Sequence, residues 1–122
     1  MSEKSFQDLA HTDDHLVEKR VSGEDVYSGI FLKMKRDTVL LPDGQQALRE
    51  YLEHPGAVAI LPILEDGRIL VERQYRYPIE QAVIEIPAGK LNLGEDPLLC
   101  AQRELQEETG YVAKRWSKIR RI

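Results

Sequence analysis

The region from Gly89 to Gly110 carries the residues with the clearest capacity for chemistry in this chain of 122 residues. Glu104, Glu107 and Glu108 recur at spacings of three and four, which place side chains on one face of an α-helix. Like charges at these spacings destabilise a helix by roughly 0.2–0.5 kcal/mol per pair unless something offsets them. Several carboxylates on one rigid element are what a hard divalent cation requires. The spacing therefore predicts a metal site, although three glutamates taken alone also fit a solvated helix face.

The residues around this acidic cluster predict where its helix begins and ends. Asp96 suits the N-cap, because its carboxylate can accept a hydrogen bond from an otherwise unpaired backbone N–H. Pro97 suits the first helical position, and Gly110 suits the left-handed residue that ends a helix. We therefore expect a helix over residues 97–109, preceded by a glycine-containing loop. A neighbouring arc of apolar residues is expected to dock this helix on a core: Leu98, Ala101 and Leu105.

The complete spacing of this region is G-x5-E-x7-R-E-U-x-E-E-x-G, where U is aliphatic, from Gly89 through Glu95 and Arg103 to Gly110. It resembles the signature of the Nudix hydrolases. This resemblance implies Mg²⁺ or Mn²⁺ bound against a diphosphate that is linked to another moiety. Tyr111 departs mildly from the family pattern, which prefers an aliphatic residue there.

Carried over to this chain, the resemblance implies a role for each residue of the motif. Glu104 and Glu108 are expected as metal ligands, with Glu107 as a further ligand or one that acts through a bound water. The carbonyl of Ala88, just before the motif, is a common additional ligand. Arg103 and Glu95 are expected to pair and to orient the glutamates. The catalytic set implied in this way is Glu95, Arg103, Glu104, Glu107 and Glu108.

The segments in front of the motif predict an α+β fold in which a small antiparallel sheet precedes the main, mixed sheet. The N-terminal sheet is expected within residues 16–54, after a flexible N-terminus of residues 1–15. Its expected strands and turns are residues 16–22, a turn at Gly23–Asp25, residues 27–41, a turn at Pro42–Gly44, and residues 45–54. Pro55-Gly56 then marks the start of a Nudix-type domain over residues 55–122.

Within residues 55–122, the pattern places strands directly before the loop and helix. The apolar run Ala57–Leu64 predicts a strand that is buried on both faces. Glu65–Gly67 predicts a hairpin turn into residues 68–77, and residues 82–88 predict a strand that leads into Gly89. A strand, a glycine loop and a helix in this order are the context that the motif requires.

The segments ALREYLEHPGAVAILPI, VERQYRYP and VIEIPAGKL are similar to the ADP-ribose pyrophosphatase branch of the Nudix family. These enzymes cleave ADP-ribose to AMP and ribose 5-phosphate, usually as homodimers that exchange their N-terminal sheets. The resemblance implies that Arg49 and Glu50 reach substrate from the partner subunit and that Arg76 contacts the diphosphate or a terminal ribose. We count Lys90, inside the motif, among the candidate substrate-binding residues as well.

Only a short segment follows Tyr111, whereas family members continue through further strands and another helix. We therefore expect that the C-terminal part of the fold, with a loop glutamate proposed as catalytic base, is missing from this chain. Two alternatives stay open beside the ADP-ribose hydrolase. One is a Nudix hydrolase for another nucleoside diphosphate derivative, and the other is a non-catalytic module that binds nucleotide.

Composition excludes several other classes of protein. The formal net charge of −4 provides no electrostatic basis for binding nucleic acid. No apolar run is long enough to span a bilayer, and the N-terminal residues lack the apolar core of a signal peptide. One cysteine, Cys100, fits a reducing compartment. We therefore expect a cytoplasmic protein with no membrane or nucleic-acid partner.

Overall fold

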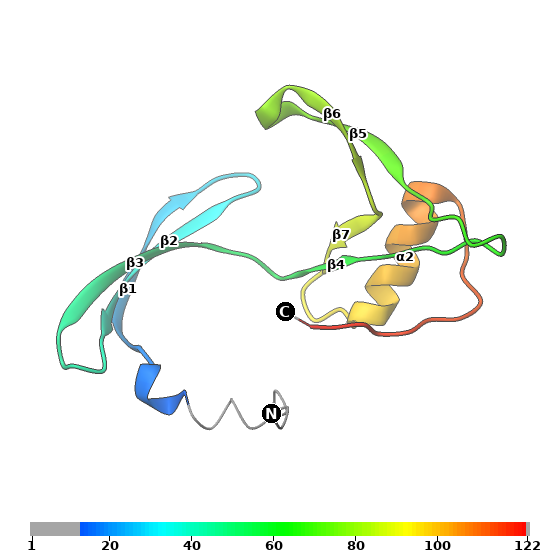
Figure 1. Cartoon of the computed structure of the whole chain (residues 1–122). Helices are drawn as coiled ribbons and strands as arrows, with labels where there is room; N and C mark the ends of the chain where they lie inside the picture. The colour runs from blue at the N-terminus through cyan, green and yellow to red at the C-terminus, as the bar shows by residue number, and fades with distance from the viewer. Residues whose placement is uncertain (1–12, 122) are drawn as a thin grey trace. The chain divides into compact units, whose positions relative to one another are not determined.

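The computed structural model describes residues 13–121, and these residues form two compact units that divide between His54 and Pro55 (Figure 1). The expectation of a flexible N-terminus falls mostly on residues 1–12, which lie outside the described residues. No helix between residues 13 and 121 has the length and apolar character needed to cross a membrane.

The N-terminal unit contains a three-stranded antiparallel sheet in the order β1-β2-β3 (Figure 1). Its elements are the short 3₁₀ helix η1 (Asp14–Leu16), β1 (Lys19–Ser28), β2 (Lys33–Leu40) and β3 (Gln46–Glu53). The predicted turn at Pro42–Gly44 is confirmed, since the Gly44 N–H donates to the Leu41 carbonyl at 3.0 Å. The small antiparallel sheet expected before the motif is therefore present.

The predicted turn at Gly23–Asp25 is wrong. Strand β1 continues through these residues, and the chain reverses at Gly29–Leu32, where the Gly29 N–H donates to the Leu32 carbonyl at 2.8 Å. Gly23 lies opposite Asp37 of β2, and a Cβ atom at position 23 would overlap the Asp37 side chain. The glycine therefore serves close packing inside a strand rather than a turn.

Asp37 connects the three strands of this sheet through its buried side chain. Its Oδ2 atom accepts hydrogen bonds from Arg20 Nε of β1 at 3.1 Å and from the Tyr51 hydroxyl of β3 at 3.0 Å. The Asp37 hydrogen bond also raises the pKa of Tyr51. A one-residue slip of either neighbouring strand would move these partners to the opposite face, so the trio favours one register.

The C-terminal unit combines two antiparallel strand pairs with one long helix. Its elements are β4 (Ala57–Ala59), β5 (Glu72–Arg76), the 3₁₀ helix η2 (Tyr77–Ile79), β6 (Gln81–Glu85), β7 (Ala88–Lys90) and α2 (Pro97–Thr109). Strand β4 pairs with β7, and β5 pairs with β6. The predicted turn at Glu65–Gly67 is confirmed by the Gly67 N–H, which donates to the Leu64 carbonyl at 2.9 Å. Together with the N-terminal sheet, this arrangement confirms the expected α+β class.

The apolar run Ala57–Leu64 differs from the prediction of a strand buried on both faces. Regular pairing covers only Ala57–Ala59, and Leu61 and Ile63 are 45% and 67% exposed. Ile60 is buried against α2, whereas its neighbours along the chain point to the other face. One helix covers one face, so burial alternates along the run.

The core of this unit lies between β4 and α2. Ile60, Ala101 and Leu105 are buried together, and Val58, Ala113 and Trp116 pack against them. Ala101 and Leu105 therefore dock the helix as predicted. Leu98, the third residue predicted for this role, is 47% exposed, because it lies in the first turn of the helix away from this cluster.

Candidate functional site

Local chemistry sets the ends of α2, the helix that carries the acidic cluster. The Asp96 carboxylate accepts hydrogen bonds from the N–H groups of Leu98 and Leu99 at 3.0 and 3.2 Å. Gly110 has a left-handed φ of 75° and its N–H donates to the Gln106 carbonyl at 2.9 Å. The predicted helix over residues 97–109 is confirmed at both ends.

Arg103 is the centre of the polar contacts on this helix. Its guanidinium forms a two-point ion pair with Glu95, with Nη2–Oε1 and Nε–Oε2 distances of 2.9 and 3.1 Å. The Nη1 group donates to Glu104 at 2.9 Å and to Glu107 at 3.2 Å. The guanidinium of Arg103 therefore holds both the loop before α2 and two of the three helix glutamates. The pairing of Arg103 with Glu95 is present in the structure, and its orienting role stays a prediction.

The pKa of Glu95 is lowered from its ordinary 4.5 to about 2. The main cause is the hydrogen bond from Arg103, followed by the bond from the Asn92 N–H, which lies 3.1 Å from Oε1. The hydrogen bond to Glu95, followed by the bond to Glu104, raises the pKa of Arg103 above its ordinary value. The ion pair therefore stays charged throughout the neutral range.

This ion pair predicts a specific dependence of stability on pH. Because the folded-state pKa of Glu95 lies below its unfolded value, its stabilising effect is complete above pH 4.5 and disappears as the pH falls toward 2. We expect a Glu95→Gln variant to melt below wild type near neutral pH and the gap to close over that acidic window. Thermal unfolding followed by circular dichroism in metal-free buffer measures this. A gap that stays constant down to the acid limit would contradict the role of the ion pair.

A matched control is available in the Glu65→Gln variant. Glu65 is highly exposed, and its ion pair with Lys114 is long, with an Nζ–Oε1 distance of 3.8 Å. Exposed pairs of this kind contribute little to stability. Its melting temperature should therefore follow that of wild type across the same pH series.

Gly89 allows the glycine loop to approach the helix closely. It lies in β7, opposite Val58 of β4, and a Cβ atom at this position would overlap the carboxylate of Glu104. Only a hydrogen atom leaves room for that carboxylate against the backbone. The first glycine of the motif is therefore explained by packing against an acidic side chain.

Glu108 has different surroundings from the other two helix glutamates. Its Oε2 atom accepts a hydrogen bond from the Ala88 N–H at 3.3 Å. Partial loss of hydration and the charge of Glu72 raise the pKa of Glu108, whereas the Ala88 bond acts in the opposite direction. The charged form of Glu108 is therefore less favourable than that of an isolated glutamate.

The donor set suits a hard divalent cation. Carboxylate oxygens of Glu104, Glu107 and Glu108 are the type of ligand that Mg²⁺ prefers, and Gly89 leaves space beside Glu104. Within residues 13–121, no three His, Cys, Asp or Glu side chains already converge as a formed metal site. Arg103 holds Glu104 and Glu107 in this structure. We therefore expect that these two glutamates must leave Arg103 before they can bind a metal ion. The Ala88 carbonyl stays a predicted ligand.

The structure brings some of the predicted substrate-binding residues near this cluster and leaves others apart. Arg76 forms an ion pair with Glu85 across the β5–β6 hairpin, with an Nε–Oε1 distance of 2.8 Å, and the charge of Glu108 acts on it. Lys90 accepts a hydrogen bond from Arg103 Nη2 through its backbone carbonyl, at 3.4 Å. Both residues thus belong to the surroundings of α2.

Arg49 and Glu50 belong to the N-terminal unit and lie on opposite faces of β3, as adjacent strand residues must. Arg49 is paired with Glu18 at 2.6 Å, and Glu50 is paired with Arg36 at 2.6 Å. A ligand lying on one face of this sheet would meet only one of the two. Their shared role in substrate binding stays a prediction.

Sequence reasoning did not single out Glu72 and Glu85. The alternation in the segment ERQYR was the available signal, because Glu72, Gln74 and Arg76 occupy every second position and share one face of a strand. The position of this strand relative to α2, however, depends on the path of the chain between β4 and β5.

Two family profiles match the chain and together cover most of it. The profile of the NUDIX domain matches residues 53–122. The profile of the nucleoside diphosphate sugar hydrolase N-terminal domain matches residues 18–52. The boundary between the two matches lies close to the division between the two units of the structure.

Two curated proteins illustrate the similarity in sequence. The chain is 46% identical over 104 residues to ADP-ribose pyrophosphatase of Bacillus subtilis (strain 168), covering 85% of this chain and 56% of that protein. It is 50% identical over 94 residues to the methanol dehydrogenase activator of Bacillus methanolicus, covering 77% of this chain and 51% of that protein. The chain thus spans about half the length of the curated relatives it matches.

A solved structure described as an ADP compounds hydrolase has the same fold. It superposes with a TM-score of 0.69 at 24% sequence identity, covering 82% of this chain and 55% of that chain. At this level of identity the match supports the fold alone.

Proposed function

Because this chain belongs to the Nudix family, we propose that it hydrolyses a nucleoside diphosphate linked to a sugar, with ADP-ribose cleaved to AMP and ribose 5-phosphate. The observation that carries this proposal is the acidic face of α2 against the Gly89 loop, with Arg103 joining Glu95 to Glu104 and Glu107. The Bacillus subtilis relative is an ADP-ribose pyrophosphatase, and this similarity, together with the N-terminal domain match, favours ADP-ribose over other diphosphates.

In this proposal Glu104 and Glu108 hold Mg²⁺ or Mn²⁺, with Glu107 and the Ala88 carbonyl as further ligands. The bound ion supplies charge neutralisation at phosphate oxygens and lowers the pKa of water. Arg103 and Glu95 orient the glutamate ligands. Their two-point ion pair fixes the guanidinium of Arg103, and Glu104 and Glu107 are held against this guanidinium until the ion binds.

Arg76 and Lys90 are proposed to bind the diphosphate on the side of the C-terminal unit. The guanidinium of Arg76 already forms an ion pair with the carboxylate of Glu85, and the same planar group can bind two phosphate oxygens. Arg49 and Glu50 are proposed to reach substrate from a second subunit. Each must leave its present ion-pair partner to do so.

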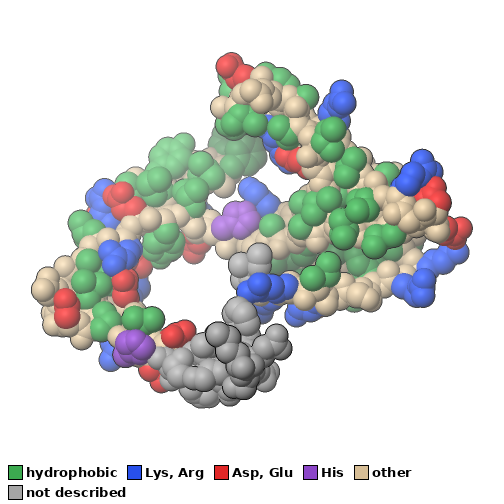
Figure 2. Space-filling view, in the orientation of Figure 1, with side chains coloured by type: hydrophobic (Ala, Val, Ile, Leu, Met, Phe, Trp, Pro, Cys, Tyr) green, Lys and Arg blue, Asp and Glu red, His purple; other side chains and the backbone are tan. Residues whose placement is uncertain are grey.

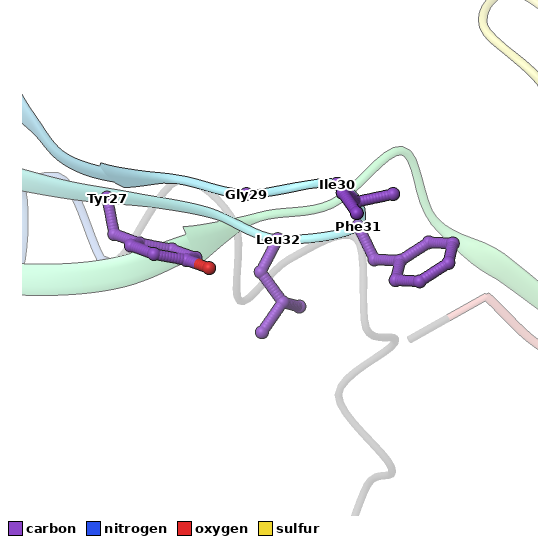
Figure 3. A pocket seen from close by; sticks show the side chains of 5 residues that line it. All are labelled: Tyr27, Gly29, Ile30, Phe31 and Leu32. Carbon is purple, nitrogen blue, oxygen red and sulfur yellow. The ribbon is translucent and has the colours of Figure 1, made fainter.

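A homodimer that exchanges N-terminal sheets is part of the proposal. The turn between β1 and β2 presents Ile30 and Phe31, which are 93% and 86% exposed. Figure 3 shows the side chains that line a hollow at this turn, among them Tyr27, Phe31 and Leu32. The volume of this hollow is about 220 Å³. Exposed apolar side chains at a turn favour a protein partner. A chain that sediments as a monomer at micromolar concentration would contradict the dimer.

Exposed hydrophobic side chains also cover much of the C-terminal unit, where Figure 2 shows them grouped over its surface. Leu61 and Ile63 beside β4 and Ile84 of β6 are examples. Surface of this kind is usually covered by further chain or by a partner. This supports the expectation that the complete fold needs additional structure around the described residues.

Two further functions compete with this one. One is suggested by the relative from Bacillus methanolicus, a methanol dehydrogenase activator: this chain would activate another enzyme. The other is a module that binds nucleotide without turnover. A cytoplasmic setting accompanies all three, supported by the single, buried and unpaired Cys100.

A substrate panel tests these functions. The chain, with its intact mass confirmed, would be incubated with ADP-ribose, ADP-glucose, a dinucleoside polyphosphate and a pyridine dinucleotide, each with and without Mg²⁺. Chromatography would measure AMP and the released phosphate ester. We expect Mg²⁺-dependent AMP formation, fastest from ADP-ribose. Tight binding without product would support the non-catalytic module, and faster turnover of another diphosphate would change the substrate.

A further inference from the structure

We propose that strand β3 of the N-terminal unit pairs edge to edge with β3 of a second copy of this chain, antiparallel and with Tyr51 at the two-fold axis. The inference goes beyond the proposed function, because it concerns the backbone edge of the N-terminal sheet rather than the acidic face of α2. It specifies one contact between two copies and depends on neither metal binding nor hydrolysis.

The two edges of the N-terminal sheet differ in how well they are protected. In the part of the chain that the structure describes, β1 and β3 each pair with β2 alone. Strand β1 has register shifts between Arg20 and Ser22 and between Asp25 and Tyr27, and such irregularities protect an edge from further pairing. Strand β3 instead pairs with β2 residue by residue over Gln46–Glu53. The regular edge of β3 is therefore the one that can accept another strand.

The hydrogen bonds of the β2–β3 hairpin show which residues of β3 face outward. The Leu41 N–H donates to the Gln45 carbonyl at 2.8 Å, so the backbone groups of Gln45 face β2. The direction of these groups alternates along an antiparallel strand. Every second residue after Gln45 therefore faces β2, and the residues between them face the open edge. Glu50 and Leu52 are among the residues whose N–H and C=O groups face outward.

Charge favours one register for two β3 strands that pair with each other. Arg49, Tyr51 and Glu53 occupy every second position of β3 and share one face of the sheet. A two-fold axis at Tyr51 places Arg49 of each copy opposite Glu53 of the other, so two pairs of opposite charge form. An axis at Arg49 or at Glu50 would instead place a like charge opposite itself. With the axis at Tyr51, Glu50 exchanges its outward hydrogen bonds with Leu52 of the second copy.

The side chains that would meet across the axis are exposed and partly held in place. Arg49, Tyr51 and Glu53 are all exposed. Glu18 accepts hydrogen bonds from Nε and Nη2 of Arg49, and the guanidinium has further N–H groups that can bind a second carboxylate. The Tyr51 hydroxyl donates to the buried Asp37 at 3.0 Å, which fixes the ring beside the edge. Two Tyr51 side chains at the axis can therefore pack as a cross-strand pair.

Reversal of charge tests the register. Glu53→Arg places an arginine opposite Arg49 on both sides of the axis. We expect the dissociation constant of the dimer to rise by about tenfold or more, since both opposed pairs change from attraction to repulsion. Adding Arg49→Glu to the same chain restores opposite charges, and association should return close to that of wild type. Sedimentation velocity of the full chain over a dilution series, without substrate or metal, measures this. A double variant that folds and associates as weakly as Glu53→Arg overturns the register.

Asp25 of β1 provides the matched control for Glu53. Both carboxylates contact Lys35, at 3.7 and 3.6 Å, but Asp25 lies on the other edge of the sheet. Asp25→Arg therefore makes the same change of charge and removes the same kind of ion pair, and its dissociation constant should stay near that of wild type. Equal weakening in Asp25→Arg and Glu53→Arg would reveal a general effect of charge and overturn the inference.

Hydrogen exchange tests the pairing in the unaltered chain, and its result stands even where a charge variant fails to fold. The amides of Glu50 and Leu52 should exchange rapidly in dilute samples and become protected as the dimer forms. The amides of Arg49 and Tyr51 bond to β2 and should be protected at every concentration. Nuclear magnetic resonance resolves the individual amides. Exchange at Glu50 and Leu52 that does not slow as the concentration rises overturns the inference.

Failure of this inference and failure of the proposed function give different results. A dimer with the same dissociation constant in wild type and Glu53→Arg is held by other contacts, so the edge pairing is wrong and the proposed hydrolase is unaffected. A chain that stays monomeric at every concentration also rejects the pairing. A chain that forms the edge pair but releases no AMP from ADP-ribose supports this inference and contradicts the function proposed above.

Discussion

Replacing Glu108 with glutamine is expected to lower Mg²⁺-dependent hydrolysis of ADP-ribose by at least about 100-fold, since even residues that only orient metal ligands contribute 10–100-fold. Glutamine keeps an oxygen that can accept the Ala88 N–H, so the contact with the loop is preserved. It also removes the charge that Glu72 opposes. The variant should therefore fold as well as wild type, and its melting temperature in EDTA should not fall.

Turnover would be measured by chromatography of AMP, and folding by circular dichroism of the same samples. The Glu65→Gln variant provides the control, because it makes the same chemical change at an exposed residue on a hairpin turn away from the site. Its turnover should equal that of wild type. Unchanged turnover in Glu108→Gln would show that Glu108 is not a metal ligand. The roles assigned to the residues of α2 would then be wrong.

Replacing Gly89 with alanine is expected to destabilise the C-terminal unit by about 1–3 kcal/mol, the usual cost of an added methyl group in a closely packed place. The new Cβ atom would occupy the position of the Glu104 carboxylate, so either that side chain or strand β7 must move. Because the Glu104 carboxylate would be displaced from its place beside the loop, we expect metal affinity to fall together with stability. Urea unfolding and Mn²⁺ titration measure the two effects.

The Gly94→Ala variant separates these two effects. Gly94 lies in the same loop with a left-handed φ of 74°, and an added Cβ atom meets no other atom within 4 Å. Alanine in this conformation costs about 1–2 kcal/mol per residue, so stability should fall. Metal affinity should be kept, because Glu104 is not displaced. Equal loss of Mn²⁺ binding in both variants would show that loop strain, rather than displacement of Glu104, causes the loss.

The errors of sequence reasoning in this chain have identifiable physical reasons. A glycine such as Gly23 favours a turn in the sequence, but here its lack of a side chain makes room for Asp37 on the neighbouring strand. The continuous apolar run Ala57–Leu64 favours a fully buried strand, but a helix packs on only one of its faces. In both cases the residue type was informative, and its meaning depended on a partner that is distant in sequence.

The sequence alone is enough to predict three features of this region. They are the ends of the helix, the order of strand, loop and helix, and the acidic face of α2. Caps, turns and helical spacing act between residues a few positions apart, so Asp96, Pro97 and Gly110 delimit α2 without help from the rest of the fold. The tertiary structure was needed to show that the Glu104 carboxylate packs on Gly89 and that the Ala88 N–H donates to Glu108. Those contacts join different elements, and their geometry depends on how a strand, a hairpin and a helix pack together rather than on local residue preference.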